Sequence, residues 1–346
     1  MRQAFIGFLI FLGVAMVNGQ EPALPLRELA AARDFYIGAA IHTEAIKSNA
    51  DYRALAEREF NLVTPENMFK FGPISPAPGE YDWSHTDALL DWAEAHHMRV
   101  HGHVLVWHQQ QPGWLNEDTY SPEQLAAILE RHIRTVVGRY KGRIHEWDVV
   151  NEAVADNGRL RDTIWLRALG PDYIAKAFEW AHEADPEAVL YYNDYNGDTP
   201  GLKADAIYKL VQGLVEEGVP VHGVGLQMHL IWQQQRSATP RAIGEVMIRL
   251  NDLGLKVAVT ELDMRIHDPN RGREAMLDLQ AEVYSNVLRA CLDAPNCDTV
   301  VVWGVSDAYS WIPGFTGNDD WPLLFDETLQ PKPAYEVVAQ ALAGED

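Results

Sequence analysis

Eight largely apolar, β-prone segments recur along the chain and alternate with segments that carry helix signals. Their apolar residues form continuous runs, which is typical of parallel strands buried on both faces. Strands that alternate with helices predict a parallel sheet with helical crossovers, and eight such strands can close into a barrel. We therefore predict a single α/β domain, a (β/α)8 TIM barrel. The segments are residues 35–41, 60–67, 99–107, 144–152, 188–196, 223–230, 256–264 and 299–307.

Helix signals stand between these runs. Ser121 is a candidate N-cap, followed by Pro122 in the first turn and by Gln124 at the capping-box position. A second helix is expected to begin at Thr239 and to be closed by Gly254. This punctuation supports a crossover helix after each strand.

Polar and aromatic residues gather where the predicted strands end. A (β/α)8 barrel carries its chemistry at the C-terminal ends of its strands, so these residues are expected to share one face of the barrel. They are Glu66, Asn67, Trp107, His108, Glu152, residues 193–196, His229, Glu261, Asp263, Trp303 and Asp307.

Two of these residues, Glu152 and Glu261, each put a carboxylate at the far end of a β-rich run. Hydrolysis of a glycosidic bond needs two carboxyl groups, one to protonate the leaving oxygen and one to meet the anomeric carbon. A carboxyl group at the end of a buried strand is costly to ionise without partners, which suits Glu152 to general acid catalysis. The alternative for Glu152 is a structural role, either capping a neighbouring helix or pairing with an arginine.

Glu261 and Asp263 lie two residues apart and therefore on one face of a strand. His229, at the end of the preceding run, can bind one oxygen of Glu261 and donate its other nitrogen to Asp263. Such a chain would fix the imidazole and keep Glu261 ionised as a nucleophile. A purely structural ion-pair network is the alternative.

Three histidines in residues 101–108 superficially suggest a metal site. His101 and His103 share a strand face, but His108 falls beyond the strand end and no HExxH-type spacing or cysteine accompanies them. We predict no metal and no cofactor, with His103 as a partner for a sugar hydroxyl and His101 in the core or lower barrel.

A mixed set of polar groups follows the second strand. Glu66, Asn67 and Lys70 offer an acceptor, an amide and a cation within one turn, which suits adjacent sugar hydroxyls. Each tryptophan taken alone fits the core, but several at strand ends favour a sugar cleft with flat apolar faces; they are Trp107, Trp303 and Trp311.

The net charge and the N-terminal segment bear on the partners and the location of the protein. The formal net charge of −22 argues against nucleic acid or an anionic membrane as partner and permits a neutral polymer. Residues 1–19 combine Arg2 with an apolar run from Ala4 to Val17, which fits a secretory signal cut after Gly19. The alternative for this segment is an uncleaved membrane anchor. After cleavage, residues 20–346 would form the catalytic domain, which we expect to be secreted from the cell or retained in a periplasm.

The chain has two cysteines, Cys291 and Cys297, near the end of a predicted helix. In an exported protein we expect them to form a disulfide rather than remain free thiols, and neither is expected to act as a nucleophile.

Several motifs together resemble the endo-1,4-β-xylanases of glycoside hydrolase family ten. They are TPEN with Lys70, GHVLVWHQQ, WDVVNE, YYNDYN, GLQMHL, VTELD and VVWGVSDAYSW, and the resemblance runs from about Leu26 to the C-terminus. It implies a cofactor-free, retaining hydrolysis of the β-1,4-xylan backbone on a (β/α)8 barrel, by a protein we expect to be monomeric. The cysteine pair also resembles a disulfide common in that family.

Matched residue by residue, the resemblance implies that Glu152 is the acid/base and Glu261 the nucleophile, supported by His229 and Asp263. It also implies three groups of substrate-binding residues. Asn151, His103, Trp107 and Gln227 would surround the sugar at the cleavage point; Glu66, Asn67, Lys70 and Gln110 would hold the next sugar on the non-reducing side; Trp303 and Trp311 would wall that half of the cleft, with Tyr195 on the leaving-group side.

Departures from the family pattern are few. Phe71 stands where tryptophan is common, and Met68-Phe69 replaces a more polar pair. We therefore expect the outer donor subsites to bind sugar units differently. Two rivals remain: a β-1,4-glucanase or mixed glucanase/xylanase, because the distinction depends on room for a hydroxymethyl group, and a non-catalytic sugar-binding barrel.

Overall fold

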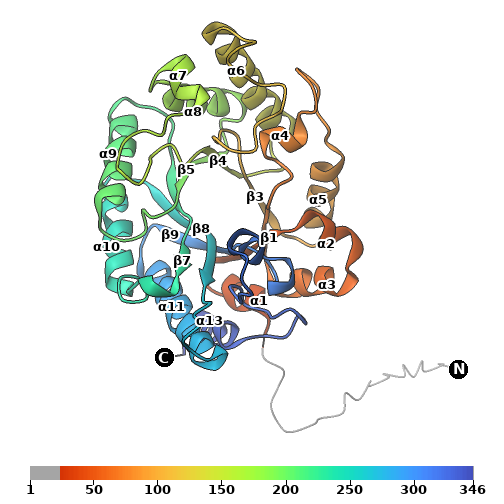
Figure 1. Ribbon diagram of the computed structural model, residues 1–346, viewed down its shortest axis with the longest axis vertical. Helices are drawn as coiled ribbons and strands as arrows, with labels where there is room; N and C mark the ends of the chain where they lie inside the picture. Colours follow the sequence, from red (N-terminus) through yellow and green to blue (C-terminus); the bar gives the residue numbers. More distant parts are fainter. Residues whose placement is uncertain (1–23, 346) are drawn as a thin grey trace, which may run out of the picture.

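A computed structural model describes residues 24–345, so the predicted signal segment, residues 1–19, lies outside the described residues. Nine strands form one sheet in the order β6-β5-β4-β3-β2-β1-β9-β8-β7, and a further pairing of β6 with β8 closes it. All strand pairs are parallel, and the helices surround the strands (Figure 1). The predicted (β/α)8 barrel is therefore confirmed.

The strands are short and almost entirely buried. Each lies within one of the predicted segments or extends it by at most two residues. They are β1 (Tyr36–Ile41), β2 (Leu62–Pro65), β3 (Arg99–Gly102), β4 (Glu146–Asn151), β5 (Val189–Asp194), β6 (Gly223–Leu226), β7 (His229–Ile231), β8 (Lys256–Arg265) and β9 (Cys297–Val302).

The helices fall between the strands as predicted. The α-helices are α1 (Leu26–Ala31), α2 (Thr43–Ser48), α3 (Ala50–Glu59), α4 (Phe71–Ile74), α5 (Ser84–Ala95), α6 (Pro122–Arg139), α7 (Ile164–Leu169), α8 (Tyr173–Ala184), α9 (Leu202–Glu216), α10 (Pro240–Asn251), α11 (Arg273–Asp293), α12 (Trp311–Thr316) and α13 (Pro333–Ala343); short 3-10 turns are η1 (Trp232–Gln234) and η2 (Asp307–Tyr309).

The predicted helix signals act as expected. The Ser121 side chain accepts a hydrogen bond from the Gln124 N–H, and the Gln124 side chain accepts one from the Ser121 N–H, which completes the capping box of α6. Thr239 caps α10 through the Ala242 N–H. Gly254 has φ +76° in the turn that leads from α10 into β8, a left-handed conformation that glycine adopts readily.

One predicted strand is wrong in detail. Residues 223–230 do not form a single strand, because Met228 has φ +60° and interrupts it between β6 and β7. Gln227 stays bonded on both sides, since its N–H donates to the Asp194 carbonyl and its carbonyl accepts from the Glu261 N–H. Beyond the turn, β7 pairs with β8 so that His229 lies opposite Asp263.

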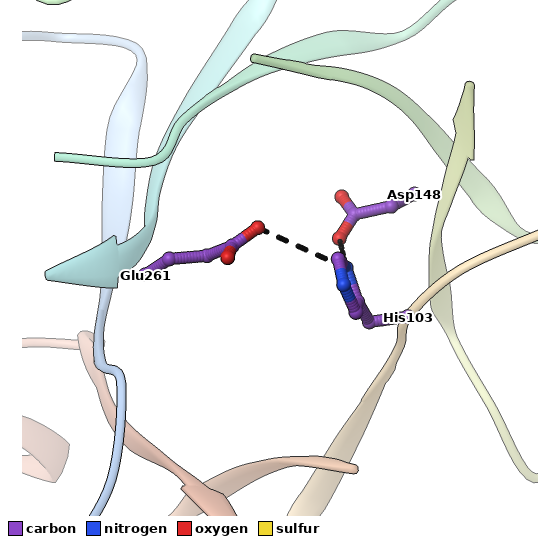
Figure 2. Close-up of side chains that lie close together, drawn as sticks. All are labelled: His103, Asp148 and Glu261. Atoms are coloured by element: carbon purple, nitrogen blue, oxygen red, sulfur yellow. Dashed lines mark hydrogen bonds and ion pairs between the residues drawn. The ribbon is translucent and has the colours of Figure 1, made fainter. Parts of the chain in front are cut away.

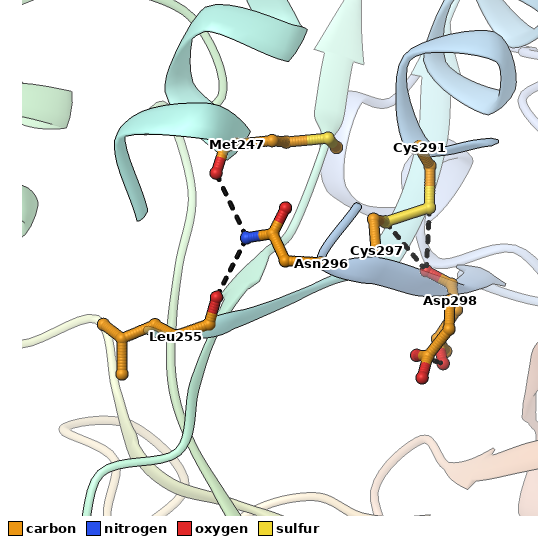
Figure 3. Close-up of a disulfide and its surroundings, with 7 residues drawn as sticks. Met247, Leu255, Cys291, Asn296, Cys297 and Asp298 are labelled. Carbon is orange, nitrogen blue, oxygen red and sulfur yellow. Dashed lines mark hydrogen bonds between the residues drawn. A yellow bond between two sulfur atoms is a disulfide. The ribbon is translucent and has the colours of Figure 1, made fainter. Parts of the chain in front are cut away.

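The structure joins Cys291, in the last turn of α11, to Cys297, at the start of β9 (Figure 3). Between them, the Asn296 side chain donates to the carbonyls of Met247 and Leu255. These contacts fix the loop that enters β9 at the N-terminal end of the barrel. Among residues 24–345, no helix has the length and apolar character needed to cross a bilayer.

Candidate active site

Glu152 and Glu261 both lie at the C-terminal face of the barrel, where the sequence predicts them. Glu152 directly follows β4. Glu261 lies within β8, and its backbone N–H donates a hydrogen bond to the Gln227 carbonyl. Both side chains are buried. The two carboxyl groups therefore share the face where barrel enzymes carry their chemistry.

Three side chains hold the Glu261 carboxylate. Asn193 Nδ2 donates to Oε1 at 2.7 Å, and His229 Nε2 lies 3.0 Å from Oε2. His103 Nδ1 lies 3.9 Å from Oε1. Burial opposes ionisation of Glu261, but the charge of His103 and the hydrogen bond and charge of His229 outweigh it and hold its pKa below the ordinary value.

The predicted hydrogen-bond chain behind Glu261 is confirmed and extends one residue further. His229 Nδ1 lies 2.9 Å from Asp263 Oδ1, and Trp311 Nε1 donates to Asp263 Oδ2 at 2.8 Å. Both nitrogens of His229 face carboxylate oxygens, and only a protonated imidazole can donate to both. Burial favours the neutral ring, yet the charges and hydrogen bonds of Asp263 and Glu261 raise the pKa of His229 to about 10.

A second histidine–carboxylate group lies across the barrel from Glu261. Asp148 Oδ1 contacts His101 Nε2 at 2.9 Å. Its Oδ2 contacts His103 Nδ1 at 2.8 Å, on the side that faces Glu261 (Figure 2). Although burial opposes it, the charge of His101 and the hydrogen bonds from both histidines lower the pKa of Asp148 to about 2. His101 is buried, as predicted for a core or lower-barrel histidine, and Asp148 orients His103 toward the nucleophile candidate.

His103, Asp148 and Glu261 bring one ligand-type atom each to within 4.8 Å of one another. Such a cluster can in principle hold a cation. However, the His103 nitrogen that faces the cluster is already hydrogen-bonded to Asp148. We therefore interpret the group as a hydrogen-bond network that orients the imidazole.

Three buried amides connect the two glutamates. Gln227 Nε2 lies 3.3 Å from Glu152 Oε1 and 3.0 Å from the Asn151 side chain, and Asn193 Nδ2 lies 3.0 Å from Asn151. Asn193 in turn donates to Glu261. With its amide turned, Asn151 would instead place its oxygen 3.2 Å from the Trp107 indole nitrogen. Polar groups in such a network leave little freedom to either carboxylate.

The residues predicted for the donor side also come together. Lys70 Nζ donates to Asn67 Oδ1 at 2.8 Å and lies 4.8 Å from the centre of the Trp107 ring. Gln110 Nε2 lies 3.5 Å from the same Asn67 oxygen. Burial raises the pKa of the Glu66 carboxyl, although the charges of His42 and Lys70 and a hydrogen bond from Asn67 oppose this shift.

The aromatic residues lie around these groups. Trp303 packs edge-on against His103 and His229, and Trp311 contacts both His229 and Asp263. Tyr195 lies apart from them, at the end of β5, where its hydroxyl accepts a hydrogen bond from Arg161. Tyr195 therefore contacts Arg161, whereas Trp303 and Trp311 contact the histidines around Glu261.

Met68, Phe69 and Phe71 are buried rather than exposed in a cleft. Phe71 stacks on His132 with ring centres 3.7 Å apart, and Phe69 packs edge-on against Trp147. Any effect of these three departures on sugar binding would therefore act through packing.

Four further residues contact the glutamates or their partners. The sequence placed Asn193 and His108 among the polar residues at strand ends but gave neither a role, and it did not single out Asp148 or Arg161. Asp148 interrupts an apolar run, and a polar position inside a strand is the signal that could have revealed it. His108 Nδ1 lies 3.8 Å from Glu152 Oε2, while burial and the charges of Arg161 and Lys203 lower its pKa to about 4. Arg161 lies in a loop, and nothing in the sequence places it beside Glu152.

The family model described as glycosyl hydrolase family 10 matches residues 25–341. The chain therefore belongs to glycosyl hydrolase family 10 and is a glycoside hydrolase.

Two curated relatives carry the same name. Endo-1,4-beta-xylanase B of Thermotoga neapolitana is 40% identical over 337 residues, which are 96% of each chain. Endo-1,4-beta-xylanase B of Paenibacillus barcinonensis is 40% identical over 90% of this chain and 97% of its own length. Among solved structures, xylanase 10B from Thermotoga petrophila in complex with xylobiose superposes with a TM-score of 0.90 at 40% identity, over 94% of this chain and 99% of that one.

Proposed function

We propose that the chain is an endo-1,4-β-xylanase that cleaves internal bonds of xylan with retention of configuration. Glu261 is the nucleophile and Glu152 the general acid/base. The observation that carries this assignment is the environment of Glu261, where an amide, a charged His229 and nearby His103 favour the carboxylate despite its burial. Relatives named as xylanases over nearly their whole length support the substrate class.

The proposed reaction has two steps. In the first, Glu152 gives its proton to the glycosidic oxygen while a Glu261 oxygen attacks the anomeric carbon, so that the old C–O bond breaks and a glycosyl–enzyme ester forms. In the second, Glu152 takes a proton from water, whose oxygen displaces Glu261 from the same carbon. Both glutamates return to their starting protonation states.

The surrounding residues receive binding roles in this proposal. Asn151, His103, Trp107 and Gln227 surround the sugar at the cleavage point. The group of Glu66, Asn67, Lys70 and Gln110 binds the next sugar, because it combines acceptors, amide donors and a cation around one short segment. Trp303 and Trp311 supply apolar walls on that side, and Tyr195 serves the leaving-group side.

The substrate separates this proposal from a glucanase. A glucose unit adds a hydroxymethyl group to each sugar, and excluding it rests on a steric difference worth about 1 to 3 kcal/mol. Reducing-sugar release from xylan should exceed that from carboxymethyl-cellulose by at least roughly tenfold. Equal rates would favour a mixed enzyme, and no release from either polymer would favour a non-catalytic barrel.

The two glutamates can be tested by separate variants. Glu261→Ala should reduce hydrolysis of every substrate, aryl xylosides included, by at least about 10⁴-fold, because all substrates need the nucleophile. Glu152→Ala should lose about 10²- to 10⁴-fold on xylan but retain the first step on dinitrophenyl xylosides, which need no proton.

Azide distinguishes the roles. It should accelerate turnover of Glu152→Ala by attacking the trapped intermediate and yield a β-xylosyl azide. Azide rescue of Glu261→Ala together with no effect on Glu152→Ala would contradict the assignment.

We propose in addition that the chain is exported, that residues 1–19 are its signal peptide and that the mature chain acts as a monomer without cofactor. The apolar run between Ala4 and Val17 and the small residue Gly19 support the cleavage site. Intact-mass analysis of exported protein should give an N-terminus at Gln20, and a chain that retains Met1 would contradict it.

A further inference from the structure

A short hairpin that begins directly after Glu152 brings Arg161 back to it. Val154 pairs with Leu160 in antiparallel fashion, and the Arg161 N–H donates to the Ala153 carbonyl at 2.7 Å. The arginine therefore returns to the start of the hairpin, nine positions after the glutamate in sequence but beside it in space.

The guanidinium group of Arg161 links two strand ends. Its Nε donates to the Glu152 backbone carbonyl at 2.9 Å, and its Nη2 donates to the Tyr195 hydroxyl at 3.0 Å. The Tyr195 ring is itself held, because Lys203 Nζ lies 3.2 Å from its centre. Half-buried and bonded at two of its nitrogens, the guanidinium has a defined position.

The Glu152 backbone needs such support. Its φ of +56° lies in the left-handed region, which is unfavourable for a residue with a side chain. Residues in this conformation persist where their surroundings fix them. The Glu152 N–H donates to the Asn193 carbonyl at 2.8 Å, and its carbonyl accepts from Arg161, so both backbone groups are bonded.

The position of the Glu152 carboxyl group follows from its backbone, which Arg161 holds through the Glu152 carbonyl. A correctly placed acid matters most when the leaving group needs a proton.

We propose that Arg161 is a positioning residue for the acid/base step: it holds the backbone of Glu152 in its left-handed conformation and thereby fixes the position of its carboxyl group. The proposal rests on the acid/base role proposed above for Glu152. Arg161 itself needs no contact with the reacting atoms.

The test compares kcat/KM of Arg161→Ala on two substrates, xylotetraose, whose leaving sugar needs a proton, and 2,4-dinitrophenyl β-xylobioside, whose leaving group does not. We expect a loss of about 10- to 100-fold on xylotetraose and less than about 3-fold on the aryl substrate. Guanidinium ion, added well below denaturing concentration, should restore part of the xylotetraose activity. Arg159→Ala is the matched control, since Arg159 is exposed on the same hairpin, and it should match wild type on both substrates.

Equal losses on the two substrates, or an undiminished rate on xylotetraose, would overturn the proposal. If Arg161→Ala does not fold, Arg161→Lys keeps the cation and should show a smaller loss with the same dependence on the leaving group. A variant that shows no such dependence would count equally against the proposal. Glu152→Ala is measured in parallel. If Glu152→Ala itself fails to discriminate between the substrates, the acid/base assignment fails rather than the role of Arg161.

Discussion

The Asn193 side chain occupies its place beside Glu261 because β6 has no side chain at Gly225. A Cβ at that position would overlap Asn193 Oδ1 and approach Thr260 Cγ2 to 2.9 Å. In the space left free, Asn193 accepts from the Thr260 hydroxyl at 2.6 Å and donates to Glu261 at 2.7 Å. A single glycine thus allows the shortest hydrogen bond to the proposed nucleophile.

Gly225→Ala should therefore act on catalysis. Displacing the Asn193 amide removes a hydrogen bond to a charged group, worth about 1.5 to 3 kcal/mol, or roughly a 10- to 100-fold loss in kcat/KM. The measurement is steady-state kinetics per folded enzyme.

Gly223→Ala is the control for Gly225→Ala, since Gly223 lies two residues earlier on the same face of β6. Its Cβ would contact Tyr191 instead of Asn193. This variant should lower the thermal midpoint and leave kcat/KM within about twofold. Full activity of Gly225→Ala would refute the role given to Asn193.

At this scale, strand parity explains which site residues the sequence could predict. Glu261 and Asp263 share a face because side chains alternate along β8, so their joint contact with His229 follows from spacing alone. The contacts of Asp148 and Asn193 depend on which buried side chains meet across the barrel. The contacts of Arg161 depend on the path of a hairpin. The spacing of residues along the sequence predicts neither kind of contact.

At the scale of elements, the disulfide connects α11 to β9 at the end of the barrel opposite the site. Cys291 and Cys297 are separated by six positions, so the ring they close is small. Loop-closure entropy for such a ring predicts about 2 kcal/mol of stabilisation. Glu152 and Glu261, the proposed catalytic residues, lie toward the other ends of their strands.

Reduction should therefore change stability without changing chemistry. We expect a thiol reductant to lower the free energy of unfolding in urea by about 2 kcal/mol and to leave kcat on xylan unchanged. A variant with both cysteines replaced by alanine should show no response to reductant. A fall in kcat that accompanies reduction of the native enzyme would contradict the separation of the two ends.

The elements themselves were largely predictable, because each strand is a buried apolar run and helices such as α6 and α10 begin with a recognisable cap. The segment 223–230 was not, since an apolar run gives no sign that Met228 turns the chain. That turn matters to the site: it lets β7 pair with β8 beside Asp263 while Gln227 faces Glu152.

At the scale of the whole molecule, buried charges set the pH range of stability. The pKa of His229 is raised to about 10, and Asp148 raises that of His101 to about 9 against the effect of burial. Their stabilisation is complete below about pH 6.5, the ordinary histidine value, and is lost as pH rises toward 9 to 10. Asp148 and Glu261, with lowered pKa values, contribute fully above about pH 4.5 and lose their contribution as pH falls.

Three further carboxyl groups stabilise the fold in acid. Burial raises the pKa of Asp194, Asp198 and Asp307 to about 6, so the stability that they add is complete below about pH 4, the ordinary aspartate value, and is lost as pH rises toward 6. The thermal midpoint, measured by calorimetry from pH 3 to 10, should therefore be highest at about pH 4 to 5 and fall steadily toward pH 9. A midpoint that is constant or rising from pH 6.5 to 9 would contradict this account.

The stereochemistry of the first product shows whether Glu261 acts as the nucleophile. A nucleophilic Glu261 requires carboxyl groups about 5 to 5.5 Å apart and two displacements at one carbon, whereas a base that activates water needs about 6.5 to 9.5 Å and a single displacement. Proton NMR of xylan or xylotetraose hydrolysis, recorded within the first minutes and before mutarotation, distinguishes them. The account predicts that the β-anomer of the new reducing end appears first and the α-anomer follows by mutarotation. Appearance of the α-anomer first would contradict it.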